Sequence, residues 1–221
     1  GREDARLSEL ALVALSGKEG AKAADRLLRR LKVAVTRYHA HGYEYDDLVA
    51  TIFKVQPRVA LDFFLERQFR PHQGRYARTL LHTFDHMVKP ITHAPDEDLL
   101  AWAADGSEDR YRRVAECIPI FVGKEPDASD SADRWWPPAL ALLEAAPNRA
   151  EVLAEYDHHV HPRSWSGSLA EIFERRRNAL MALDSHSDPV VRDWSLRWQS
   201  ELADRIPYER SRESRRDQSF E

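Results

Sequence analysis

Apolar residues recur at three-and-four spacing on both sides of one short turn near the C-terminus, and this pattern restricts the chain to helices packed in pairs. Before the turn the stripe predicts a helix over residues 167–184, and after it a second helix over 190–206 and beyond. Asp188 can cap the second helix, and Pro189 suits its first position, where no amide hydrogen is needed. A turn this short places the two helices antiparallel, and one such pair cannot bury its apolar stripe without neighbours.

A short motif in this second helix resembles a known repeat family. It consists of Asp188, Pro189, Val191 and Arg192, followed by a small residue at Ser195 and an apolar one at Trp198. This motif resembles the second helix of a HEAT repeat, a family in which the Asp and Arg tie successive turns together and the small residue allows close helix approach. Ser195 stands where that family usually has Ala, and Trp194 is unusually large. The resemblance implies a row of stacked helix pairs.

Turn signals recur along the chain at an interval that fits such repeats. They fall near Pro57, Ser107, Asn148 and Pro189, roughly 40 to 50 residues apart, and HEAT and armadillo repeats have a period of about 40–47 residues. We therefore predict an all-α fold, a HEAT-like α-solenoid of about ten or eleven helices in antiparallel pairs. Further helices are expected over residues 5–15, 21–41, 45–55, 58–70, 75–88, 96–104, 108–121, 136–146 and 148–156. No segment shows the alternation expected of a strand.

The whole chain, residues 1–221, is expected to form a single helical-repeat domain. Its start at Gly1, in place of Met, suggests a fragment of a longer chain. Residues 205–221 are rich in charged side chains and predict a helical extension of the last helix. Two interpretations of this extension remain open: a solvated end that frays, or an element that caps the array or contacts a neighbour.

The charge balance argues against a chain dedicated to nucleic acid. Lys and Arg number 33, Asp and Glu 37, and the net charge is −4, although local basic patches remain possible. The single cysteine, Cys117, cannot form an intramolecular disulfide, and its apolar neighbours predict a buried thiol. This cysteine usage suits a reducing compartment, so we expect a cytoplasmic protein. No stretch approaches the ~20 apolar residues of a membrane span, and no secretory signal is found.

Two adjacent tryptophans are candidate partner-binding residues. Trp135 and Trp136 cannot both face the core from one turn of a helix, so one of them is expected to be exposed as a contact anchor. The alternative is that both pack beneath the acidic loop over residues 123–133.

Arginine clusters are the second kind of candidate contact. The cluster singled out for partner binding is Arg175, Arg176 and Arg177. Similar clusters occur within residues 26–30 and 110–113, and together they could meet phosphates on one side of an array. Acidic residues lie beside each cluster, which favours ordinary soluble surface with weak ion pairs.

Histidines provide the only candidate metal ligands. His82 and His86 are four residues apart on an expected helix, but the glutamate of the zinc-protease motif is missing. His158, His159 and His161 form the densest cluster, at an expected helix end, where imidazoles also interact well with the helix dipole. We assign no metal and no cofactor. The sequence contains no glycine-rich phosphate loop, no Gly-x-Ser-x-Gly and no Cys-x-x-Cys.

The function favoured by these patterns is non-catalytic protein recognition or scaffolding through the extended surface of stacked repeats. The partner would be another protein or other domains of the parent chain, without a membrane. By architecture and composition the chain resembles the C-terminal arms of large bacterial signalling or anti-phage defence proteins. The alternatives are a nucleic-acid-binding helical array and a metal-dependent enzyme that uses the histidine clusters.

Overall fold

The computed structural model describes residues 2–38, 41–66, 80–82, 84, 89–122, 133–162 and 165–218. Within these ranges nearly every regular element is a helix, so the predicted all-α class is confirmed. The chain divides into two compact units, residues 1–118 (unit 1) and 119–221 (unit 2). One continuous domain over residues 1–221 stays a prediction. None of the helices in the described ranges combines the length and apolar character needed to cross a bilayer.

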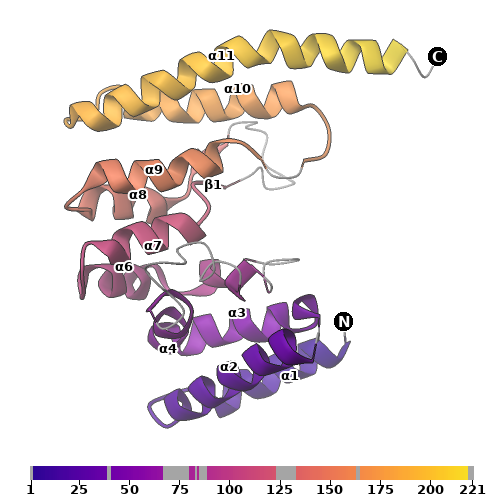
Figure 1. Ribbon diagram of the computed structural model, residues 1–221, viewed down its shortest axis with the longest axis vertical. Helices are drawn as coiled ribbons and strands as arrows, with labels where there is room; N and C mark the ends of the chain where they lie inside the picture. The colour runs from indigo at the N-terminus through magenta and orange to yellow at the C-terminus, as the bar shows by residue number, and fades with distance from the viewer. Residues whose placement is uncertain are drawn as a thin grey trace. The chain divides into compact units, whose positions relative to one another are not determined.

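Unit 1 contains α-helices and short helical turns (Figure 1). Its elements are α1 (Arg2–Ala14), α2 (Gly20–Arg37), a 3-10 turn (Gly42–Tyr45), α3 (Asp46–Val55), α4 (Pro57–Leu61), a π turn (Asp62–Glu66), a 3-10 turn (Pro90–His93), α6 (Asp96–Ala104) and α7 (Asp109–Cys117). Aromatic rings form part of its core: Phe64 stacks on Phe53 with ring centroids 5.7 Å apart and meets Phe84 edge-on at 6.1 Å.

The helices of unit 1 begin close to the predicted positions but differ in length. α4 starts at Pro57, at the first helical position that suits proline, and continues into the π turn that ends at Glu66. The rest of the helix expected over 58–70 lies outside the described residues. The same holds for the helix expected over 75–88, except for 80–82 and 84, so His86 cannot be placed relative to His82.

Unit 2 contains two helix pairs and a short strand pair. Its elements are β1 (Phe121–Val122), β2 (Arg134–Trp135), α8 (Pro137–Ala145), α9 (Arg149–Val160), α10 (Leu169–Leu180), a 3-10 turn (Met181–Leu183) and α11 (Pro189–Gln218). β1 and β2 are antiparallel, with Phe121 opposite Trp135. The core beside them holds Tyr156, whose hydroxyl donates to the Ala139 carbonyl at 2.8 Å and whose pKa is raised by burial.

The strand pair corrects one expectation. The helix predicted over 108–121 ends at Cys117, because Ile118 precedes a proline and takes an extended conformation (φ −86°, ψ 149°). The chain is then already extended at Phe121 and pairs with Arg134–Trp135. Two residues per strand are too few to produce a visible alternation, so the sequence contains no signal for this strand pair.

α11 packs beside α10 along the length of α10 (Figure 1). Ser168 caps α10 and accepts a hydrogen bond from the Glu171 amide at 3.1 Å. Ser195 is fully buried between the helices, and its hydroxyl donates to the Leu180 carbonyl at 2.8 Å. A small residue is therefore needed at this position, and serine also supplies a donor to a carbonyl near the end of α10.

The charged end of α11 packs against α10. α11 continues through an exposed Pro207 to Gln218. Its Glu213 carboxylate accepts hydrogen bonds from the Ser168 hydroxyl at 2.8 Å and from the amides of Leu169 and Ala170 at 2.7 and 3.2 Å. Arg210 pairs with Glu174 on α10. These contacts tie the extension to the start of α10 as far as Glu213, so a freely fraying end is the wrong interpretation for this part.

Candidate functional site

The outward face of α2 is the candidate site, because it combines exposed cations with exposed apolar side chains. Helix α2 contains six cationic residues and one acid. Its inner side is held in place by buried Ala24, Leu28 and Leu31. A Cβ at Gly20 would lie 1.9 Å from the Leu15 carbonyl oxygen, so glycine is required where α2 starts against the end of α1. Five of the six cations, all except half-buried Lys32, are consequently exposed.

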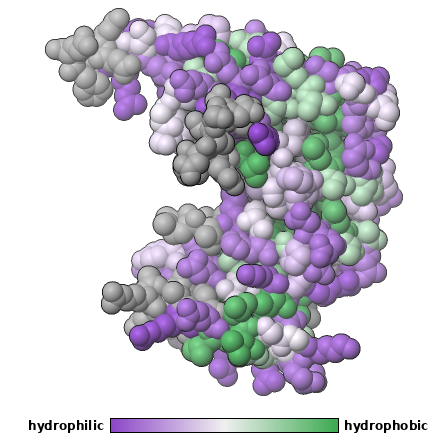
Figure 2. Space-filling view, turned by 180° about the vertical axis from the view of Figure 1, so that it is seen from behind, coloured by the Kyte–Doolittle hydropathy of each residue, from purple (hydrophilic) through white to green (hydrophobic). Residues whose placement is uncertain are grey.

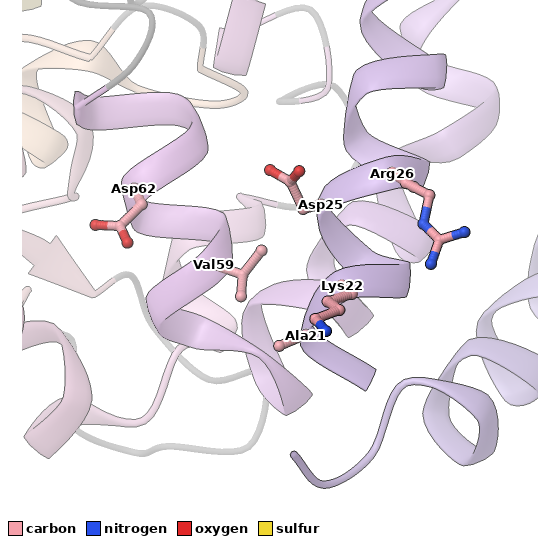
Figure 3. A pocket seen from close by; sticks show the side chains of 6 residues that line it. All are labelled: Ala21, Lys22, Asp25, Arg26, Val59 and Asp62. Carbon is pink, nitrogen blue, oxygen red and sulfur yellow. The ribbon is translucent and has the colours of Figure 1, made fainter. Parts of the chain in front are cut away.

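A first hollow lies between α2 and α4 and has a volume of about 430 Å³ (Figure 3). Its lining residues are Ala21, Lys22, Asp25, Arg26, Val59 and Asp62. Asp25 points into the space between the helices, whereas Arg26 points away from it (Figure 3). Both carboxylates already have partners: Asp25 accepts from Arg29 Nε at 2.9 Å, and Asp62 from the Trp102 indole at 2.8 Å. Their hydrogen bonds reduce their availability to act on a bound molecule.

A second hollow, which we call the α2 groove, lies on the C-terminal half of the same helix. It is lined by Arg29, Arg30, Val33, Ala34 and Tyr38 and has a volume of about 400 Å³. Val33 is 39% exposed and Tyr38 77% exposed. Apolar residues gather over the N-terminal helices of unit 1 on the face shown in Figure 2. A hollow with an apolar floor and arginines beside it is typical of a surface that binds another protein, rather than of a helix face that contacts only water.

Only part of this site could be predicted from the sequence. The sequence shows the basic cluster at 26–30 as a possible phosphate contact, but helical spacing predicts Tyr38 on the inward face of the helix expected over 21–41. Tyr38 instead follows the last residue of α2 and is exposed. Seven residues separate Tyr38 from buried Leu31, so helical spacing places both on one side of α2. The exposure of Tyr38 therefore depends on what packs around the end of the helix, which the spacing does not specify.

The arginines proposed for partner binding have different environments. Arg175 Nε donates to Asp133 at 3.0 Å, and Arg176 Nε donates to the same carboxylate at 3.4 Å. Arg176 also donates to the Val160 carbonyl at 2.6 Å, and burial lowers its pKa although Asp133 opposes that shift. Arg177 is exposed. The first two guanidinium groups therefore hold α10 to β2 and α9, and Arg177 alone of the three faces solvent.

The two tryptophans are not on one turn of a helix. Trp135 belongs to β2, and Trp136 is the residue before α8. Trp135 is 8% exposed, and its indole donates to the Ala179 carbonyl at 2.9 Å. Trp136 is half-buried. Trp135 is therefore part of the core of unit 2, and contact of Trp136 with a partner stays a prediction.

The motif at 188–192 makes the local contacts that its residue types suggest. The Asp188 carboxylate accepts from the Val190 amide at 2.9 Å, which is the main reason that its pKa is lowered, and from Arg149 at 3.1 Å. Pro189 opens α11, and Val191 is fully buried. Arg192 donates to the carbonyls of His186 and Ser187 in the preceding turn. Asp188 thus caps its own helix and is joined to the preceding pair through Arg149.

Polar bridges between turns recur within each unit. In unit 1, Gln56 donates to the carbonyls of Leu15 and Gly17, both at 2.6 Å, and Arg58 donates to Asp105 at 2.6 Å. In unit 2, besides the bond between Arg149 and Asp188, His186 contacts Glu144 at 2.8 Å. Each bridge joins turns of successive helix pairs. Helices were predicted on both sides of the first of these turns, at 15–19, but the bridging roles of Gln56 and Arg149 were not predicted.

The histidine cluster at 158–161 is spread over two environments. His158 is exposed at the end of α9. His161 lies between the rings of Phe173 and Trp198, at centroid distances of 5.4 and 5.3 Å, and 3.6 Å from Glu201. Among the described residues, no three His, Cys, Asp or Glu side chains come together in a way that could hold a metal ion.

The arginines at 110–113 are largely engaged in ion pairs. Arg110 and Arg113 both contact the Glu66 carboxylate, at 3.1 and 3.2 Å, and Arg113 also contacts Asp109 at 3.2 Å. Arg110 lies over the ring of buried Trp102 at 4.4 Å. These cations are committed to packing within unit 1.

Comparison of the chain with models of protein families, with curated proteins and with solved structures returned no match.

Proposed function

We propose that the chain is a non-catalytic protein-recognition or scaffold module whose helix pairs stack as HEAT-like repeats. The observation that supports this proposal is the series of polar bridges between successive turns, such as Arg58 with Asp105 and Arg149 with Asp188. The bridged residues are separated by 47 and 39 positions, close to the period of about 40–47 of such repeats. Bridges at this spacing keep neighbouring pairs in register.

A register that repeats has a functional consequence. When each pair is placed in the same way on the one before, outward helices line up and present an extended surface, which is how stacked repeats bind partners. We propose that the chain acts as an arm of a larger bacterial signalling or anti-phage defence protein in the cytoplasm. The partner would be another protein or another domain of that parent chain.

Two observations make protein a better partner than nucleic acid. The arginines at 110, 113, 175 and 176 are paired with carboxylates, so they offer little charge to phosphates. The exposed face of α2, in contrast, has apolar side chains among its cations. Apolar contact area is characteristic of protein interfaces.

Cross-linking in cells tests this function. The tagged full chain, with a photoreactive residue at several exposed positions of both units, is captured from the organism that encodes it, with and without nuclease. We expect one specific protein that is retained after nuclease treatment and competed by the untagged chain. Recovery of nucleic acid alone, or of no specific protein from any position, would contradict the proposal.

A further inference from the structure

The α2 groove has the features of a docking site for a helix. Its floor is formed by Val33, Ala34 and Tyr38, and Arg29 and Arg30 lie beside them. Lys22, Arg26 and Arg37 lie on the same exposed side of α2. α2 is 18 residues long, which corresponds to about 27 Å of helix. A second helix of several turns could therefore lie along it.

We propose that the α2 groove binds an acidic amphipathic helix of a partner protein, with an apolar side chain placed over Val33 and carboxylates beside Arg30 and Arg26. This inference rests on the proposed role in protein recognition and names the chemistry of the partner. The argument is charge complementarity: α2 has five more cations than acids, although the net charge of the whole chain is −4. An acidic helix is attracted to this helix and repelled by much of the remaining surface.

Nucleic acid fits the same surface less well. A phosphate backbone needs cations along the groove, but the groove floor is apolar at Val33, Ala34 and Tyr38. The neighbouring hollow presents the carboxylates of Asp25 and Asp62, which repel phosphates. Arg29 is already paired with Asp25 at 2.9 Å. An amphipathic helix with acids beside an apolar stripe complements both the apolar residues and the arginines of this surface.

The experiment uses the full chain and a synthetic probe. The probe is an 18-residue fluorescein-labelled peptide that has leucines at helical spacing and glutamates on both sides of them, and binding is followed by fluorescence anisotropy. A second peptide has lysine in place of every glutamate. We expect the acidic peptide to bind at least about tenfold more tightly than the basic one, a difference of about 1.4 kcal/mol.

Variants locate the binding. Val33→Asp and Arg30→Glu change exposed residues of the groove and are each expected to weaken binding of the acidic peptide at least about tenfold. Matched controls are Val190→Asp and Arg215→Glu, which make the same changes at exposed positions of α11 and should leave binding within about twofold. Circular dichroism of each variant verifies that the helices are retained.

Three outcomes overturn the inference: no binding of the acidic peptide, equal binding of the basic peptide, or binding that the groove variants do not weaken. A labelled single-stranded RNA that binds in place of the peptide and is lost in Arg30→Glu also overturns it. If a protein captured in cells still binds the Val33→Asp and Arg30→Glu variants, this inference alone is contradicted. The recognition role would then remain, with its surface elsewhere.

Discussion

At the scale of single residues, carboxylates that accept several hydrogen bonds hold neighbouring helices together. Asp157 on α9 accepts from the indoles of Trp194 and Trp198, at 2.7 and 2.6 Å, and from Arg197 at 2.9 Å. Both tryptophans are 6% exposed. Each donor comes from α11, so one side chain connects the last helix to the preceding pair.

The first prediction concerns Asp157. Asp157→Ala leaves two largely buried indole N–H groups without their acceptor, and an unsatisfied buried donor costs about 1–3 kcal/mol. We therefore expect unfolding free energy in urea to fall by roughly 2–4 kcal/mol, with a red shift of tryptophan emission. The control is Asp204→Ala at an exposed position of α11, where a change of at most about 0.5 kcal/mol is expected. Equal effects of the two substitutions would contradict this role.

The second prediction concerns pH. Burial lowers the pKa of His161 below its ordinary value of 6.5, Arg205 lowers it further, and Glu201 opposes the shift. The folded state therefore binds fewer protons than the unfolded state in this range, so stability falls as pH falls below about 6.5. We expect His161→Gln to reduce the loss of melting temperature between pH 7.5 and 5.5.

The matched control for this pH effect is His158→Gln, at an exposed position of α9. Carboxylates with lowered pKa values, such as Asp188 and Glu213, lose their stabilising effect only below their ordinary values of 3.8 and 4.5, so they do not contribute in this window. A pH dependence that is the same in the wild type and in His161→Gln would exclude His161 as its source.

At the scale of elements, helix ends are the points where neighbouring elements are joined. Arg149 at the start of α9 donates to the carbonyls of Leu143 and Glu144 at the end of α8, and also to Asp188 in the next turn. Arg110 makes a similar pair of bonds to the carbonyls of Trp102 and Asp105 in unit 1. An arginine early in the second helix thus caps the first helix of its pair.

The third prediction concerns the hydrogen bonds between Glu213 of α11 and the start of α10. Burial disfavours the ionised Glu213, but hydrogen bonds from Ser168, Ala170 and Leu169 outweigh it and lower its pKa. Glu213→Ala removes these acceptors from the start of α10, at a cost of roughly 1 kcal/mol. We expect faster hydrogen exchange of the Leu169 and Ala170 amides.

The control for Glu213→Ala is Glu151→Ala, which removes an exposed acid from the first turn of α9. It should leave exchange at α10 unchanged. If Glu213→Ala leaves exchange at α10 unchanged as well, the end of α11 does not hold α10 in solution.

At the scale of the whole molecule, the proposed row of helix pairs makes a prediction about size. A compact globule of this length has a radius of gyration of about 17 Å, whereas a single row of pairs is longer and should exceed about 20 Å. Small-angle X-ray scattering of the full chain measures this value. A radius near 17 Å with a symmetric distance distribution would contradict the row.

The sequence was sufficient for features set by local chemistry. Helical spacing and turn residues predicted the helices, and Asp188 caps α11 as expected, because a cap depends only on residues a few positions away. The burial of Cys117 was likewise predicted from its apolar neighbours. Proline positions indicated where helices begin, although Pro119 was overlooked as the reason that α7 ends at Cys117.

Only the tertiary structure decided which polar groups are paired and which remain available. Arg176 and Arg30 look alike in the sequence, but Arg176 packs against Asp133 and Val160, whereas Arg30 lines the exposed α2 groove. Partners some 40 positions apart are brought together by the packing of one helix pair on the next, and no local pattern specifies them. The candidate site follows from that packing, because the described part of the chain leaves one side of α2 uncovered.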